Sequence, residues 1–98
     1  MTFARRVDEN HGLIKKAFEQ CGCSVLDLFR LGGNAPDLLV SCCGIDQLVE
    51  VKSDGGRLSD GQEEFHRDWR GSKPRVIRTV KEAALLVSDM GARARSMR

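Results

Sequence analysis

The chain has 98 residues, of which 41% are hydrophobic and 31% are charged, and this suits one globular domain spanning residues 1–98. No apolar run approaches the roughly 20 residues of a membrane span and no signal peptide is evident, so we expect a cytoplasmic protein without a membrane partner. The net charge of +2 is too small to indicate a nucleic-acid partner by itself.

The first part of the chain predicts a helix followed by a strand. Over residues 5–21, apolar side chains recur at helical spacing with charged residues between them. Asp8 or Asn10 is suited to cap the start of this helix, and Gly22 to end it. Apolar and polar positions then alternate over residues 24–31, which predicts one continuous strand.

Two apolar strands follow, over residues 38–42 and 47–52, and a glycine-containing turn joins them. Side chains alternate across a strand, so Glu50 and Lys52 share one face of the second strand. Asp37 precedes the first strand and is expected near Glu50 at the same end of the hairpin. Two charges on one face of an apolar strand are costly to bury unless they have partners or a metal.

The second half of the chain predicts a helix, a strand and a final helix. Ser59 begins the helix, and the spacing of Ser59 and Gln62 is typical of a capping box. A strand is expected over residues 74–80 and a helix over residues 81–90. Residues 91–98 are basic, and we expect them to form a flexible tail.

Two aromatic residues share a face of the helix that begins at Ser59. Phe65 and Trp69 are four positions apart, so they lie on the same side of a helix. Aromatic pairs of this kind are found both in cores and in sites that stack nucleobases. The core interpretation is favoured here.

The four cysteines occur as Cys21-Gly22-Cys23 and Cys42-Cys43, and neither pair has the spacing of a zinc knuckle. Without a secretory signal we expect them to be reduced, with Cys42 a buried strand residue.

The sequence Pro36-Asp37, followed by Glu50-Val51-Lys52, resembles the signature of the PD-(D/E)xK nucleases. The segment 58–69 resembles the one that follows the core in the virus-type replication-repair (VRR-NUC) branch. The resemblance extends from about residue 5 to residue 87 in the order and type of elements. It implies an α/β restriction-endonuclease-like fold of order αβββαβα, with a central mixed four-stranded sheet flanked by helices.

Residues of this type can support metal-dependent phosphodiester hydrolysis. Magnesium prefers oxygen ligands and keeps several waters, so the carboxylates of Asp37 and Glu50 are sufficient, with the Val51 carbonyl as a further ligand; Mn²⁺ is an alternative. Lys52 would orient the attacking water or stabilise charge on the phosphate. Gln62 would act beside Lys52, or serve only as the helix cap.

Related junction-resolving nucleases carry a glutamate on the first helix, and the matching position here is His11. Glu9 lies nearby in sequence but on a different helical face. His11 and Glu9 are therefore candidates for an additional part of the site. His66 is another, either as a polar companion of the carboxylates, as a phosphate contact or as a surface residue.

The resemblance implies a homodimeric endonuclease that cuts branched DNA, a Holliday-junction resolvase encoded by a phage or prophage and active in a bacterial host. The basic residues expected to bind DNA are Arg5, Arg6, Lys15, Arg57 and Arg67. The alternatives are a nuclease for flaps or other branched or nicked DNA, an inactive DNA-binding module of the same fold, and a structural protein with an incidental ion pair.

Overall fold

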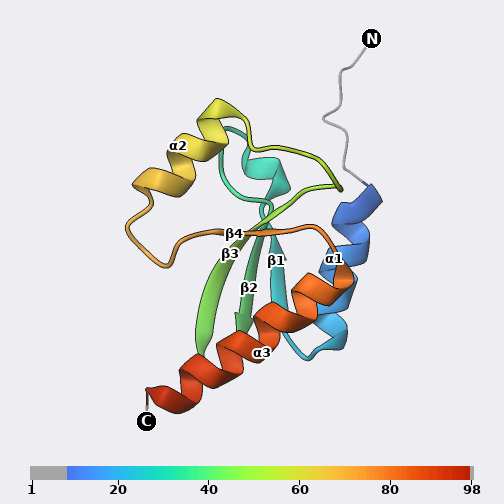
Figure 1. Cartoon of the computed structure of the whole chain (residues 1–98), viewed down its shortest axis with the longest axis vertical. Helices are drawn as coiled ribbons and strands as arrows, with labels where there is room; N and C mark the ends of the chain where they lie inside the picture. Colours follow the sequence, from blue (N-terminus) through green and yellow to red (C-terminus); the bar gives the residue numbers. More distant parts are fainter. Residues whose placement is uncertain (1–8, 98) are drawn as a thin grey trace.

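The computed structural model describes residues 9–97, and it shows a chain with one mixed four-stranded sheet and three α-helices. In order, the elements are α1 (Glu9–Gln20), β1 (Ser24–Asp27), the short 3₁₀ helix η1 (Phe29–Leu31), β2 (Leu38–Cys42), β3 (Ile45–Val51), α2 (Asp60–Asp68), β4 (Arg75–Ile77) and α3 (Val80–Ser96). The sheet order is β1-β2-β3-β4 (Figure 1). The predicted α/β fold class is therefore confirmed.

The sheet combines an antiparallel meander with one parallel strand. β1, β2 and β3 pair in sequence as antiparallel neighbours, whereas β4 pairs with β3 in parallel after the chain has crossed through α2. The β2–β3 hairpin turns at Cys43 and Gly44, whose φ angles are 59° and 78°. A two-residue turn with positive φ at both positions matches the twist of the strands it joins.

One face of the sheet carries the hydrophobic core, which α1 and α3 cover together (Figure 1). The largest fully buried apolar side chains come from both helices and the central strands: Ile14, Phe18, Leu38, Val40, Val49, Leu86 and Met90. α2 lies apart from these two helices, beyond the end of the sheet where β2 begins and β3 ends (Figure 1). Within residues 9–97, no helix is long and apolar enough to cross a membrane.

The predicted strand over residues 24–31 is wrong in its second half. The strand ends at Asp27, whose Oδ1 accepts a hydrogen bond from the backbone N–H of Phe29 at 3.0 Å. An aspartate that bonds the backbone two residues further on forms a local turn, which competes with the strand. The chain then continues as η1 rather than as an extended strand.

The predicted tail is also wrong, because α3 continues through Gly91 to Ser96. Alanine and arginine, which favour helices, fill positions 92–95, and they offset the cost of one glycine. Arg93 pairs with Asp89 one turn earlier, with 3.1 Å between Arg93 Nε and Asp89 Oδ2. The helix therefore ends about two turns later than the glycine rule predicts.

The four cysteines gather at the opposite end of the sheet from α2, and all are free thiols. Ser24 pairs with Ser41, so Cys23 lies opposite Cys42, and Cys42 Sγ is 3.5 Å from Cys43 Sγ. Cys23 is buried, whereas Cys42, predicted to be buried, is only half-buried. Burial raises the pKa of the Cys23 thiol to about 12, aided by its hydrogen bond with Cys42 and by the neighbouring thiols.

Candidate functional site

Asp37 and Glu50 lie opposite each other across the β2–β3 hairpin. Leu38 pairs with Val49, and the antiparallel register therefore sets the preceding Asp37 against Glu50. Directly opposed residues of an antiparallel pair project from the same face. Asp37 Oδ2 accepts a hydrogen bond from the Val51 backbone N–H at 2.8 Å, which orients this carboxylate at the hairpin end. The predicted proximity of the two acids follows from this register.

Lys52 follows β3 directly and is held in place through its backbone. Its N–H donates to the Ile77 carbonyl at 3.1 Å, which extends the pairing of β3 with β4 by one residue. Its carbonyl accepts a hydrogen bond from the Asn10 side-chain amide at 2.8 Å. Because Lys52 is two residues beyond Glu50, the alternation of an extended chain directs both side chains to one face.

Glu50 is the most deeply buried charged residue of the described chain, with 1% of its surface exposed. Its Oε1 lies 3.8 Å from Nε2 of His66, which is 6% exposed and projects from α2. The structure thus brings His66, predicted as an additional site residue, to the central carboxylate. Asp37, Glu50, Lys52 and His66 are called the Glu50 site below.

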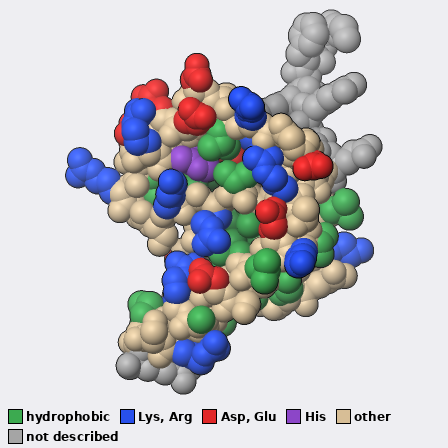
Figure 2. All heavy atoms as spheres, viewed as in Figure 1, with side chains coloured by type: hydrophobic (Ala, Val, Ile, Leu, Met, Phe, Trp, Pro, Cys, Tyr) green, Lys and Arg blue, Asp and Glu red, His purple; other side chains and the backbone are tan. Residues whose placement is uncertain are grey.

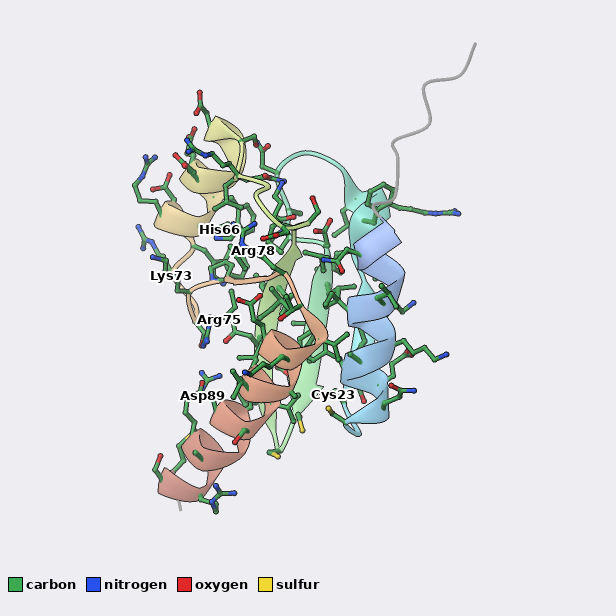
Figure 3. All side chains as sticks on the ribbon, turned by 45° about the vertical axis from the view of Figure 1, so that its right-hand side comes forward. Cys23, His66, Lys73, Arg75, Arg78 and Asp89 are labelled. Carbon is green, nitrogen blue, oxygen red and sulfur yellow. The ribbon has the colours of Figure 1, made fainter. Side chains whose placement is uncertain are left out.

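His66 lies near two lysines as well as the Glu50 carboxylate. Burial lowers the pKa of its imidazole below the usual range, and the positive charges of Lys73 and Lys52 lower it further. Lys73 precedes β4, and Figure 3 shows it on the same side of the molecule as His66. The sequence indicated basic residues at 73–78, but nothing in it placed Lys73 beside a helix that ends five residues earlier.

Gln62 serves as a helix cap. Its side-chain Oε1 accepts a hydrogen bond from the Ser59 N–H at 2.9 Å, while the Ser59 hydroxyl accepts one from the Gln62 N–H at 3.2 Å. The predicted capping box is therefore confirmed. A catalytic role for Gln62 stays a prediction.

His11 makes its contacts on the helix-covered side of the sheet. Its Nε2 lies 2.8 Å from Asp27 Oδ2, and its ring packs edge-on against Phe29. Asp27 pairs with Leu38, a residue of the face that α1 and α3 cover. Partial burial raises the pKa of Asp27, but the hydrogen bonds from His11 and the Phe29 N–H, together with Lys15, outweigh this and lower it. The side chain of Glu9 lies outside the described residues.

The basic residues predicted to bind DNA are dispersed over the chain. Lys15 belongs to α1, and its Nζ lies 3.9 Å from Asp27 Oδ2. Arg67 belongs to α2, where it forms an exposed ion pair with Asp68. Arg57 is exposed in the loop that follows β3. Arg5 and Arg6 lie outside the described residues. Basic side chains do gather around the hollow between α2 and β4 (Figure 2), and Lys73 and Arg75 belong to it.

Arg78 and Asn10 have structural roles that sequence reasoning missed. The Arg78 guanidinium donates to the carbonyls of Ser53 at 3.0 Å and Gly56 at 2.5 Å, so it organises the glycine-rich loop after β3. Asn10 Nδ2 donates to the Arg78 carbonyl at 2.8 Å as well as to Lys52. These contacts could be predicted only from the pairing of β4 with β3, which the sequence does not indicate.

The oxygen donors of the Glu50 site suit a hard divalent cation. Magnesium is commonly bound through one or two carboxylates with waters in its remaining positions, and Asp37 and Glu50 supply two. Among the residues that the structure describes, no three or more His, Cys, Asp or Glu side chains form a group suited to a metal ion. A metal site formed by Asp37, Glu50 and the Val51 carbonyl stays a prediction.

Comparison of the chain with protein-family models, with curated proteins and with solved structures finds no match. The resemblance to VRR-NUC nucleases therefore rests on the residues and the order of elements.

Proposed function

We propose that this chain is a metal-dependent endodeoxyribonuclease that hydrolyses phosphodiester bonds in branched DNA. The observation that carries the proposal is the β2–β3 register, which sets Asp37 against a buried Glu50 at the hairpin end that continues into Lys52. Burying a carboxylate costs free energy that neighbouring groups must offset, and one such neighbour of Glu50 is His66, with 3.8 Å between His66 Nε2 and Glu50 Oε1.

Each residue of the Glu50 site would have its own role in the proposed reaction. Asp37 and Glu50, with the Val51 carbonyl, would hold Mg²⁺ or Mn²⁺, which when bound would polarise the phosphate and activate water. The Lys52 ammonium would stabilise negative charge that builds on the phosphate. Neutral His66 would accept or donate a hydrogen bond at the substrate. The hydrogen bond from the Val51 N–H keeps the Asp37 carboxylate oriented.

Branched DNA is the proposed substrate class, and a four-way junction its best representative. A two-fold homodimer would carry two identical sites, so it could cut two symmetric strands of a junction. Basic side chains around the hollow between α2 and β4 would bind phosphates without reading sequence.

The experiment uses end-labelled four-way junction, flap, linear duplex and single-stranded DNA, each with Mg²⁺, Mn²⁺ or chelator. Wild type is compared with Glu50→Gln, which keeps the side-chain shape and removes the charge. Asp46→Asn is the matched control, since Asp46 is an exposed acid on the same strand that bonds only locally, to Ser41. Metal-dependent cleavage that Glu50→Gln abolishes and Asp46→Asn retains supports the proposal.

The outcomes separate the alternatives. Paired cuts in the junction alone support a resolvase, whereas cutting of flap or other DNA forms keeps the nuclease and changes its substrate. An inactive DNA-binding module is the second candidate, because His11, at the position of a catalytic glutamate in related enzymes, is bonded to Asp27. Binding of every substrate with no cleavage by wild type would establish that candidate and refute the nuclease.

A further inference from the structure

A groove borders the Glu50 site, between α2 and the segment that leads into β4. It has a volume of about 760 Å³, and its lining residues come from the loop before α2, from α2 and from residues 69–76. They include Glu63, His66, Arg67, Trp69, Lys73 and Arg75. This volume lies within the range of small-ligand sites. His66 belongs both to the groove and to the Glu50 site, so the groove adjoins the site through His66, whose Nε2 lies 3.8 Å from Glu50 Oε1. It is called the Trp69 groove below.

Trp69 is not part of the core, contrary to the prediction. The helix ends at Asp68, and Trp69 follows with an extended backbone (ψ 122°), which removes it from the helical spacing that would have buried it. Its side chain is 47% exposed. Tryptophan is enriched among the residues that contribute most to binding, so an exposed indole that lines a groove is a candidate ligand contact.

The indole is nevertheless held in a defined position. Its ring stacks on Phe65, with 5.3 Å between the ring centroids and 14° between the planes. Its Nε1 lies over Gly71, where a Cβ atom would come within 2.7 Å of it. The backbone N–H of Trp69 donates to the Phe65 carbonyl at 3.0 Å. The exposed aromatic surface is therefore presented on a rigid support rather than on a mobile side chain.

The charges of the Trp69 groove favour an anion beside this aromatic surface. Arg67, Lys73 and Arg75 line it together with a single acid, Glu63. Arg67 and Arg75 also form ion pairs with Asp68 and Asp89, which do not line the groove. Figure 3 shows Lys73 and Arg75 on the same side of the molecule as His66. An aromatic ring beside basic side chains is the arrangement by which proteins bind single-stranded nucleic acids, the ring stacking on a base and the cations contacting phosphates.

We infer that the Trp69 groove binds an unpaired nucleotide of the substrate, with its base against Trp69 and a neighbouring phosphate near Lys73. This deepens the proposed function and rests on it, because the bound nucleotide would adjoin the strand presented to Glu50. Bases in an intact duplex are stacked on one another and are not free to enter. The groove therefore selects DNA with unpaired nucleotides, such as flaps, single strands and branch points at which base pairs have opened.

Trp69 is the one tryptophan of a chain without tyrosine, so it reports on its own contacts by fluorescence. The protein is titrated in chelator, which separates binding from cleavage, with a short oligothymidylate and with an abasic oligonucleotide of the same length and charge. We expect saturable quenching by the oligothymidylate and an affinity for the abasic strand lower by about 5- to 150-fold, since stacking contributes this much per base. Equal affinity and equal quenching with both strands overturn the inference.

Variants provide a second measurement, by anisotropy of a labelled oligonucleotide. Trp69→Ala should abolish the preference for strands with bases, whereas Trp69→Phe should retain part of it. Leu31→Ala is the control, because Leu31 is also exposed and apolar but does not line the groove. If Trp69→Ala keeps the full preference while remaining folded by circular dichroism, the inference is wrong.

The Glu50→Gln variant allows this inference to be tested separately from the nuclease proposal. Quenching that depends on bases, retained in Glu50→Gln, supports the groove whether or not wild type cleaves DNA. Cleavage that depends on Glu50 but is unchanged by Trp69→Ala on flap and single-stranded substrates refutes the groove and leaves the nuclease intact.

Discussion

Asn10 joins three elements that are far apart in the chain, and its replacement tests how the Glu50 site is anchored. One side-chain amide in the first turns of α1 donates to the carbonyls of Lys52 and Arg78, each at 2.8 Å. These carbonyls immediately follow β3 and β4. Asn10 thus fixes the helix against the ends of two adjacent parallel strands.

The expected loss of stability on replacing Asn10 follows from its two hydrogen bonds. A typical intramolecular hydrogen bond contributes about 0.5–1.5 kcal/mol net, so Asn10→Ala should lower the free energy of unfolding by roughly 1–3 kcal/mol. Alanine has a higher helix propensity than asparagine, so propensity alone would make the variant more stable. A measured loss of stability therefore comes from the lost hydrogen bonds. Asn10→Asp should cost at least as much, because it sets carboxylate oxygens against two carbonyls.

Urea denaturation followed by circular dichroism gives the free energies, with Gln20→Ala, at an exposed position of the same helix, as the control. A change below about 0.5 kcal/mol for Asn10→Ala, the size of an ordinary surface substitution, would refute the anchoring role. If the nuclease proposal holds, the same variant should lower cleavage more than DNA binding, since the Lys52 backbone would lose a support.

Two further predictions concern stability. Gly91→Ala should raise the free energy of unfolding by about 0.5–1 kcal/mol, since Gly91 is inside α3 and an added Cβ would contact only the flexible end of Arg95, at 3.4 Å. Thermal melting checks this increase. Gly44→Ala, at a φ of 78°, should instead destabilise the protein. The raised pKa of Cys23 predicts a loss of stability between pH 9 and about 12, because over this range the unfolded thiol ionises while the folded one stays protonated. Cys23→Ala should show a shallower decline over that range in urea midpoints, and parallel slopes would contradict the assignment.

The Glu50 site was predictable where its members share the hairpin. Glu50 and Lys52 are two residues apart on one strand, and the short turn at Gly44 forces Asp37 to the same end, so local alternation and chain reversal are sufficient. The proximity of Lys73 depends instead on where the crossover through α2 returns, which no local pattern records. Asn10 resembled a helix cap for the same reason, because its acceptors lie in strands that only the folded chain brings near.

The elements that differ from the sequence predictions do so for local reasons that the hydrophobic patterns do not record. Asp27 ended a strand through a hydrogen bond that its own side chain makes with the backbone. Trp69 left the core because α2 stopped one residue before it. Gly91 does not end α3, because the residues after it favour a helix and Arg93 forms an ion pair with Asp89, so the helix continues to Ser96. In each case a contact of one side chain, or one residue of helix length, decided the outcome.

The parallel pairing of β4 with β3 has a consequence for the order in which the chain folds. The hairpin of β2 and β3 closes over two residues, whereas β4 reaches β3 only after the 23 residues between Val51 and Arg75 have been placed. Contacts between residues distant in sequence form more slowly because a longer loop must first close. We therefore expect Asp37 and Glu50 to meet early during synthesis and folding, and His66 and Lys73 to join them late. A nascent chain would carry the two carboxylates and Lys52 before it carries Lys73, the second cation near His66.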